Sequence, residues 1–149
     1  MSDIKMKSYR PFITENFFWD FPTHFNLKEV SEFLGQEIDP TTQYISNTAK
    51  TIMRNEGIYW FIQRKHHEEI NASISLSDLD LKAHQAALMI TFKDLSDAEK
   101  SEISKRLLVF LKDQLALKTI EISQLDDIVQ ENFTNNGYTV SNNNILKRS

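Results

Sequence analysis

The chain has 149 residues, of which 40% are hydrophobic; this length suits one well-buried core and is short for two. The formal net charge of −4 argues against a nucleic-acid-binding surface, which needs clustered Lys and Arg. The absence of cysteine excludes disulfides, thiolate zinc sites and a cysteine nucleophile, and it fits a reducing compartment. No apolar run has the length of a membrane span, and the N-terminal residues lack the apolar core of an export signal. We therefore expect one cytoplasmic domain over residues 1–149, without nucleic-acid or membrane partners.

The chain opens with a strand-like segment and an aromatic-rich stretch. Residues 9–13 resemble a short strand, and Pro11 favours a sheet edge or a strand end because proline donates no ladder hydrogen bond. For the aromatic stretch, core packing of a helix and its following loop is favoured over the lining of a ligand pocket. Its aromatic side chains are Phe17, Phe18, Trp19, Phe21 and Phe25.

Two amphipathic helices are predicted next. Asn26 can cap the first helix, and Gly35 can end it because glycine tolerates the left-handed conformation. Thr41 or Thr42 can cap the second helix, and Gly57 follows its end. The spacing of the apolar residues in both segments indicates one buried face per helix.

The pattern then changes to the alternation that is typical of strands. Residues 58–64, 70–76 and 86–92 are predicted to form an antiparallel meander with one covered face. A long helix follows from Ser96. Residues 118–122 read as a strand reached by this helical crossover, so we expect that strand to run parallel to the one over residues 86–92.

The C-terminal part is predicted to add one helix and one short strand. The helix covers residues 126–135, the strand covers residues 138–140, and the polar segment 142–144 is expected to fray. The whole order of elements predicts an α+β fold with a mixed, mainly antiparallel twisted sheet flanked by helices.

The joint between the strand over 86–92 and the following helix contains no glycine. Free amides and the macrodipole make helix N-termini attractive to anions. Here Ser96 and Glu99 have capping-box spacing, in which each side chain accepts from the other residue's amide. Asp97 adds further negative charge, so this helix is expected to cap itself and to repel a diphosphate. Lys100 could reach a phosphate, although a solvated surface lysine is the favoured interpretation.

Other candidate sites rest on weaker patterns. The His-His-Glu-Glu run at 66–69 contains zinc-ligand residue types, but adjacent residues rarely converge on one ion, and the run reads as an exposed turn. His24 and His84 are isolated and are interpreted as surface or rim residues. No nucleophile-elbow pattern is present, so a hydrolase has no positive support.

The order of elements and three short motifs resemble the GNAT superfamily of acyl-CoA-dependent N-acetyltransferases. The motifs are Tyr-Arg-Pro-Phe at 9–12, Tyr-Trp-Phe-Ile at 59–62 and Asn-Gly-Tyr at 136–138. They look closest to the branch of ribosomal-protein alanine N-acetyltransferases, and the resemblance covers nearly the whole chain. It implies transfer of an acetyl group from acetyl-CoA to a primary amine, carried by a small molecule or a peptide.

The resemblance also implies where acetyl-CoA binds. In the family, pantetheine lies against a splayed strand, here residues 86–92, and the pyrophosphate lies on a Q/R-x-x-G-x-G/A loop, here residues 95–100. The signature positions of that loop are unmatched, because Leu95, Ala98 and Lys100 occupy them. The implied cofactor-binding residues are Met89, Ile90, Thr91, Phe92, Ala98, Glu99, Lys100 and Ser101.

The positions associated with catalysis depart from the family as well. Ala87 stands where related enzymes often carry Glu, and Phe133 where many carry a Tyr proton donor, so neither can transfer a proton. Asp126 replaces a frequent Asn, and no catalytic residue is assigned. We expect either an N-acetyltransferase that works by positioning or a non-catalytic GNAT-fold binding or regulatory module that has lost acetyl-CoA binding. An unrelated α+β domain would lack the splay between residues 86–92 and 119–122. The acceptor and the oligomeric state stay open.

Overall fold

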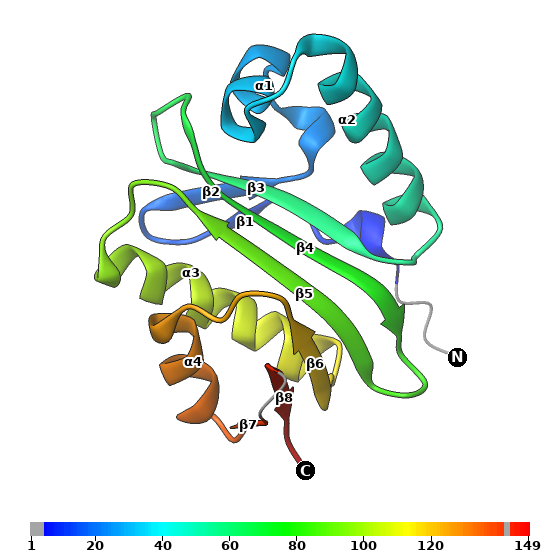
Figure 1. The fold of residues 1–149 in the computed structure, drawn as a ribbon, viewed down its shortest axis with the longest axis vertical. Helices are drawn as coiled ribbons and strands as arrows, with labels where there is room; N and C mark the ends of the chain where they lie inside the picture. Colours follow the sequence, from blue (N-terminus) through cyan, green and yellow to red (C-terminus); the bar gives the residue numbers. More distant parts are fainter. Residues whose placement is uncertain (1–4, 142–143) are drawn as a thin grey trace.

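The computed structural model describes residues 5–141 and 144–149, and one sheet runs through it (Figure 1). The strands of this sheet are β1 (Phe12–Ile13), β2 (Phe17–Asp20), β3 (Ile58–Arg64), β4 (Ile70–Asp80), β5 (Gln85–Phe92), β6 (Thr119–Ile122), β7 (Thr139–Val140) and β8 (Ile145–Lys147). They lie in the order β1-β2-β3-β4-β5-β6-β8-β7. All neighbours are antiparallel except β5 and β6, which are parallel. The expected fold class is confirmed.

Helices cover both faces of the sheet. They are α1 (Leu27–Leu34), α2 (Ile38–Met53), α3 (Asp97–Val109) and α4 (Asp127–Thr134), with short 3-10 turns at Met6–Ser8 and Pro22–His24 and a π-helical turn at Phe110–Gln114. Helices α1 and α2 lie over β3 and β4 on one face, and α3 and α4 lie on the other (Figure 1). In the part of the chain that the structure describes, no helix is both long and apolar enough to cross a membrane.

The main core lies between the sheet and α3. Trp19, Trp60 and Phe110 form its aromatic centre, with the Trp60 and Phe110 rings 5.2 Å apart in an edge-on arrangement. A smaller cluster around Phe61 lies on the opposite face of the sheet, under α1 and α2. Alternate residues of β3 therefore serve two different cores, which explains why nearly every residue of this strand is apolar.

The first part of the aromatic-rich stretch forms strand β2, so the expected helix is wrong, whereas the expected core packing is confirmed for Phe17, Trp19 and Phe21. Strand β2 pairs with both β1 and β3, and Phe17 and Trp19 are fully buried. Phe18 faces the other way, where its ring lies 6.4 Å from that of Phe25. Because both faces of this segment meet aromatic neighbours, it lacks the polar alternation that marks a strand.

The helix starts agree with the sequence in two cases and differ in one. Asn26 caps α1 by accepting from the Lys28 amide at 2.8 Å, and Ser96 caps α3. Helix α2 begins at Ile38, ahead of the expected Thr41 or Thr42. Pro40 therefore lies in the first turn of α2, which tolerates proline because the amides of a first turn have no helical partner.

The C-terminal strands are only partly as expected. Strand β6 runs parallel to β5, as predicted, and β7 covers Thr139–Val140. Strand β8 was not predicted, yet it pairs with both β6 and β7. Its three residues, Ile145–Lys147, are too few to show a period. Residues 142 and 143, where fraying was expected, lie outside the described residues.

Gly57 provides a test of the packing between β3 and β4. The residue is buried, and a Cβ added to it would overlap the carbonyl oxygen of Leu76 on β4. We expect Gly57→Ala to lower the free energy of unfolding by roughly 2 to 4 kcal/mol, because strand backbones cannot move apart cheaply. The measurement is urea unfolding.

Gly35→Ala is the matched control for this substitution. Gly35 has φ +66 and no atom near its added Cβ, so alanine there should cost only about 1 kcal/mol of left-handed strain. A loss of stability in Gly57→Ala no larger than in Gly35→Ala would contradict the packing argument.

Candidate active site

Strands β5 and β6 run side by side for only part of the length of β5. Their parallel register ends where Leu88 lies opposite Ile122, the last residue of β6. The Ser123 amide then donates to the Leu88 carbonyl oxygen at 3.4 Å. Beyond this point β5 continues to Phe92 without a partner on the β6 side, because the chain after β6 turns away from it (Figure 1). The splay that the sequence led us to expect is therefore present.

The splay leaves peptide groups of β5 open. The Leu88 carbonyl faces β6, and the Lys93 amide donates to the Asn71 carbonyl oxygen on β4 at 2.7 Å. Because peptide groups alternate in direction along a strand, the amides and carbonyls of Ile90 and Phe92 face the β6 side. No strand among the described residues pairs with them there. They are strong hydrogen-bonding groups that an extended ligand can use.

The start of α3 satisfies two of its first amides, those of Ser96 and Glu99, with its own side chains. The Ser96 hydroxyl accepts from the Glu99 amide at 3.2 Å, and Glu99 Oε1 accepts from the Ser96 amide at 3.0 Å. The Lys100 amide donates to the Ser96 carbonyl oxygen at 2.9 Å. The predicted capping box is confirmed, and it uses amides that an anion would otherwise contact.

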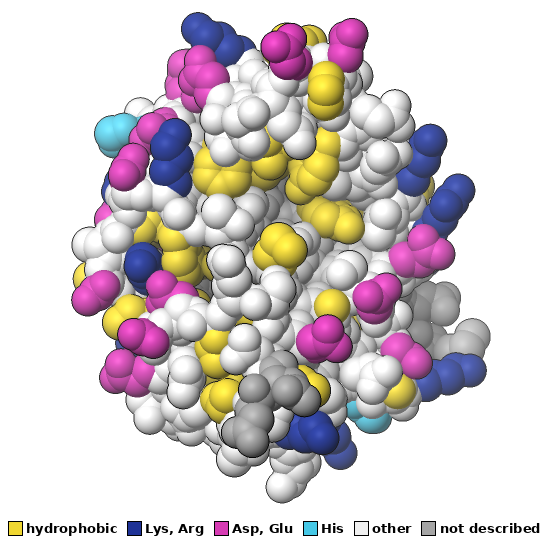
Figure 2. Space-filling model, viewed as in Figure 1, with side chains coloured by type: hydrophobic (Ala, Val, Ile, Leu, Met, Phe, Trp, Pro, Cys, Tyr) yellow, Lys and Arg dark blue, Asp and Glu magenta, His cyan; other side chains and the backbone are white. Residues whose placement is uncertain are grey.

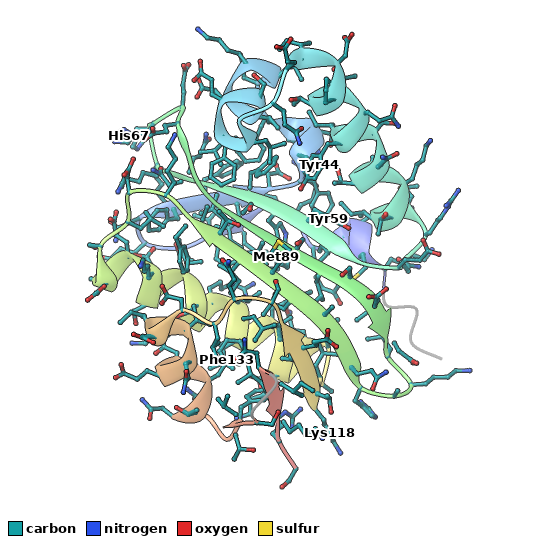
Figure 3. The ribbon with its side chains drawn as sticks, in the orientation of Figure 1. Tyr44, Tyr59, His67, Met89, Lys118 and Phe133 are labelled. Atoms are coloured by element: carbon teal, nitrogen blue, oxygen red, sulfur yellow. The ribbon has the colours of Figure 1, made fainter. Side chains whose placement is uncertain are left out.

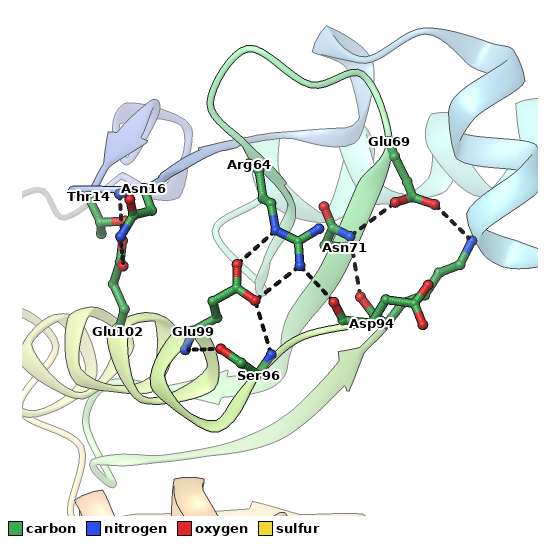
Figure 4. A network of polar contacts seen from close by, with 10 residues as sticks. Thr14, Asn16, Arg64, Glu69, Asn71, Asp94, Ser96, Glu99 and Glu102 are labelled. Atoms are coloured by element: carbon green, nitrogen blue, oxygen red, sulfur yellow. Dashed lines mark hydrogen bonds and ion pairs between the residues drawn. The ribbon is translucent and has the colours of Figure 1, made fainter.

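Arg64 reinforces this arrangement from β3 (Figure 4). Its Nε lies 2.7 Å from Glu99 Oε2, its Nη2 lies 3.0 Å from Glu99 Oε1, and Nη2 also donates to the Asp94 carbonyl oxygen at 2.7 Å. The hydrogen bonds from Arg64 and from the Ser96 amide lower the pKa of Glu99 to about 2. Sequence reasoning missed Arg64, because it lies 35 residues before Glu99 in the chain.

Lys100 and Asp126 form a second ion pair, which joins the starts of α3 and α4. Lys100 Nζ lies 3.1 Å from Asp126 Oδ2 and 5.5 Å from the centre of the Phe92 ring. Asp126 also caps α4 by accepting from the Ile128 amide at 2.8 Å. The expectation of a solvated surface lysine is wrong, because Lys100 is half-buried and paired. Its ammonium lies beside the open end of β5.

The residues implied as cofactor contacts lie along the second half of β5, on both faces of the sheet, and in the first turns of α3. Along β5, Met89 and Thr91 face α1 and α2, while Ile90 and Phe92 face α3. Met89 lies in the open middle of the sheet face (Figure 3) and is 53% exposed. Ser101 accepts from the side chain of Asn132 on α4 at 3.3 Å. The remaining three residues, Ala98, Glu99 and Lys100, form the first turns of α3.

The positions of the missing acid and base differ in exposure. Ala87 lies on the open sheet face and lines a hollow there. Phe133 is fully buried on α4, and its ring packs 5.3 Å from that of Tyr138 (Figure 3). Phe133 therefore acts as core, and neither residue can move a proton.

The sheet face beside α1 and α2 is hollowed (Figure 2). One hollow of about 150 Å³ lies over β5 and β6, and another of about 470 Å³ lies between α2, β3 and β4. They meet at Asp78, and Glu56 and Glu121 supply further carboxylates. No lysine or arginine belongs to the described residues that line either hollow. Opposite charges attract, so this surface favours cations.

Tyr59 lines the larger hollow together with Asp78, and the ring of Tyr44 lies 6.4 Å from that of Tyr59 (Figure 3). Burial raises the pKa of Tyr44 to about 12. The pKa of Tyr59 is raised by burial and by the charge of Asp78. Both phenols therefore stay neutral at physiological pH and can donate a hydrogen bond.

The other candidate sites bring no chemistry together. Among residues 5–141 and 144–149, no group of His, Asp or Glu side chains could hold a metal ion. His24 is exposed at the rim of an apolar hollow beside α2. His84 is half-buried, and its Nδ1 lies 3.1 Å from the Ala116 carbonyl oxygen.

Solved structures of N-acetyltransferases share this fold. A ribosomal-protein alanine acetyltransferase from Vibrio fischeri superposes with a TM-score of 0.73 and 8% identity, over 89% of this chain and 84% of that one. The Campylobacter jejuni N-acetyltransferase PseH superposes with a TM-score of 0.65 and 10% identity, over 89% and 99%. The microcin self-immunity acetyltransferase MccE, in complex with acetyl-CoA and AMP, gives 0.64 and 14% identity, over 91% and 93%.

These similarities confirm the resemblance to the GNAT superfamily at the level of the fold. They are similarities of three-dimensional structure. A scan of known protein families finds no match, and neither does a search of curated protein sequences.

The Glu99 pair predicts a pH-dependent loss of stability. Because folding lowers the pKa of Glu99 from its ordinary 4.5 to about 2, the ionised pair stabilises the fold fully above about pH 4.5 and is lost as the pH falls toward 2. We expect Glu99→Gln to lower the free energy of unfolding by roughly 0.5 to 1 kcal/mol at pH 7. Urea unfolding of both proteins should show this difference shrinking below pH 4.5. A difference that stays constant down to pH 3 would contradict the assignment.

Proposed function

We propose that the chain is an acyl-CoA-dependent N-acetyltransferase that moves an acetyl group from acetyl-CoA to a primary amine. The observation that carries this proposal is the open half of β5, which lies beside the start of α3 in a fold shared with N-acetyltransferases. The complex of MccE with acetyl-CoA supports this choice of cofactor.

In the proposed complex, the pantetheine arm lies along the open part of β5. The peptide groups of Ile90 and Phe92 match its amides as hydrogen-bonding partners, and they do so without regard to side-chain identity. The side chains of Met89 and Thr91 border the arm on the sheet face that α1 and α2 cover. The diphosphate lies at the first turns of α3, against Ala98, Glu99, Lys100 and Ser101.

The acceptor amine approaches from the hollowed face, toward the point where β5 and β6 diverge. The carboxylates of Asp78 and Glu121 favour an amine that carries a second positive charge, on a small molecule or a peptide. The neutral amine attacks the thioester carbonyl carbon, the coenzyme A thiolate leaves, and the amine proton passes to water. We assign no side chain as general base, so the rate acceleration comes from positioning the amine against the thioester.

A second candidate function is a non-catalytic binding or regulatory module. It is favoured by the capping box at Ser96 and Glu99, which satisfies the amides of these two residues without a ligand. Ala87 and Phe133 favour the same candidate, because they stand in the positions where related enzymes often carry a Glu and a Tyr proton donor. The two candidates differ in one respect that can be measured, because only the enzyme binds acetyl-CoA.

Calorimetric titration with acetyl-CoA separates these candidates. We expect saturable binding, and a few-fold tighter binding in Ala98→Gly, because glycine lets a phosphate approach the first turn of α3. Ala83→Gly is the control; Ala83 is exposed in the turn between β4 and β5, and its replacement should leave the affinity unchanged. No heat of binding at millimolar acetyl-CoA, in any of the three proteins, would reject the enzyme and favour the non-catalytic module.

The acidic face predicts the charge preference of the acceptor. We expect Asp78→Asn to raise the KM for an alkyl diamine by about 3- to 10-fold at low salt, with little change in kcat, because a uniform binding interaction is lost. Release of coenzyme A thiol measures the rate. Glu131→Gln, an exposed change on α4, is the control and should leave the KM unaltered. Equal effects on a diamine and on an uncharged aromatic amine would count against the acidic face as the acceptor site.

A further inference from the structure

A third hollow lies beside α2, away from the proposed cofactor site. It has a volume of about 220 Å³. Its lining comes from the N-terminal residues Lys7 and Arg10, from Phe21 with the turn Pro22–His24 that follows it, and from the second half of α2. Strands β3 and β4 lie between β2 and β5 in the sheet, so this hollow is separate from the open half of β5.

The lining of this hollow is mostly apolar. Phe21 and Ile52 are buried, Ala49 is half-buried, and the Met53 side chain is 63% exposed. Methionine is flexible and adapts its shape to an apolar ligand. An apolar cavity of about 150 Å³ can hold a benzene ring, so a hollow of about 220 Å³ has room for an aromatic ring with a short alkyl chain.

The charged groups of the lining are cations. Lys7 and Arg10 are exposed, and His24 adds an imidazole N–H donor. No Asp or Glu among the described residues lines this hollow, which distinguishes it from the two acidic hollows over β3 to β6. An apolar cavity with cations around it is complementary to a ligand that has an apolar body and an acidic group.

Contacts within the chain hold the cationic side of the hollow in place. Arg10 Nε and Nη2 lie 2.6 and 2.8 Å from the two carboxylate oxygens of Asp20, which is 2% exposed. Within residues 5–141 and 144–149, Nη1 of Arg10 has no hydrogen-bond partner. The Met6 amide donates to Asn55 Oδ1 at 2.9 Å, which ties the turn that carries Lys7 to the end of α2. Because these groups are already ordered, a ligand pays little entropy to use them.

We propose that this hollow is a binding site for a small carboxylic acid with an aromatic ring on a short alkyl chain. The ring lies against Phe21, Ala49 and Ile52, and the carboxylate meets Lys7 and Arg10. Asp20 offsets the charge of Arg10, so Lys7 supplies the net positive charge and Arg10 Nη1 supplies a hydrogen bond. The inference does not depend on the proposed acetyl transfer, because the hollow shares no lining residue with the proposed cofactor site.

The test is a titration of the ¹⁵N-labelled protein with phenylpropionate, followed by amide chemical shifts. We expect saturable shifts at residues 48–53, with a Kd of roughly 0.1 to 1 mM for a ligand of this size. Phenylpropanol has the same ring and chain without the charge, and it should bind about fivefold more weakly. Propionate, which lacks the ring, should give no saturable shift.

Two variants, each with a matched control, locate the ring and the carboxylate. Ala49→Phe fills the hollow and should weaken phenylpropionate binding by at least about tenfold, because the ring loses its apolar contacts. Val109→Phe, at an exposed position of α3, is its control. Lys7→Gln should weaken binding about threefold at low salt. Lys105→Gln, an exposed change on α3, should leave the affinity unaltered.

Each outcome of these titrations supports or overturns the inference. Tighter binding of the acid than of the alcohol, with losses in Ala49→Phe and Lys7→Gln alone, would support it. Equal affinities for the acid and the alcohol, unchanged affinity in either variant, or no shift at about 10 mM phenylpropionate would overturn it. Lys7 is exposed, so Lys7→Gln decides the matter even where Ala49→Phe fails to fold.

The same spectra distinguish a small ligand from a second copy of the chain. Shifts at residues 48–53 that appear when the protein is concentrated without ligand would place another copy in the hollow, which would also overturn the inference. Spectra that do not change with protein concentration would support it.

Discussion

The structure depends on one constraint, which is that β6 ends while β5 continues. Strand β6 stops at Ile122 and the chain turns toward α4, so β5 runs on to Phe92 without a partner on that side. Unpaired peptide groups in a sheet interior are costly, and a ligand with amide groups can satisfy them. The divergence therefore links the fold to the proposed cofactor, because the feature that interrupts the sheet also creates the binding edge.

The negative charges at the start of α3 disfavour the diphosphate of the proposed cofactor, whereas the unpaired peptide groups of β5 favour its pantetheine arm. Glu99 serves at once as half of a capping box and as the partner of Arg64, which stabilises the helix start and places negative charge in the first turn of α3. Lys100 is likewise engaged by Asp126 on α4. The proposed cofactor site thus combines the unpaired peptide groups of β5 with negatively charged side chains at the start of α3.

Local patterns predicted much of the fold and of the helix start, but not the long-range pairs. Periodicity placed the meander from β3 to β5, and spacing alone identified the capping box at Ser96. Strand β2 was missed, because aromatic residues on both faces hide the strand period. The pair of Arg64 and Glu99 joins residues 35 positions apart, so only the packing of α3 against the sheet reveals it. The burial of Phe133 likewise became visible only in the tertiary structure.

The central claim is that the open half of β5 binds the pantetheine arm of acetyl-CoA. The most direct measurement is a crystal structure of the protein grown with acetyl-CoA. The account predicts an extended pantetheine arm that is hydrogen-bonded to the peptide groups of Ile90 and Phe92, with the diphosphate at the first turns of α3. A cleft that is closed by packed side chains and holds no ligand at saturating acetyl-CoA would contradict it.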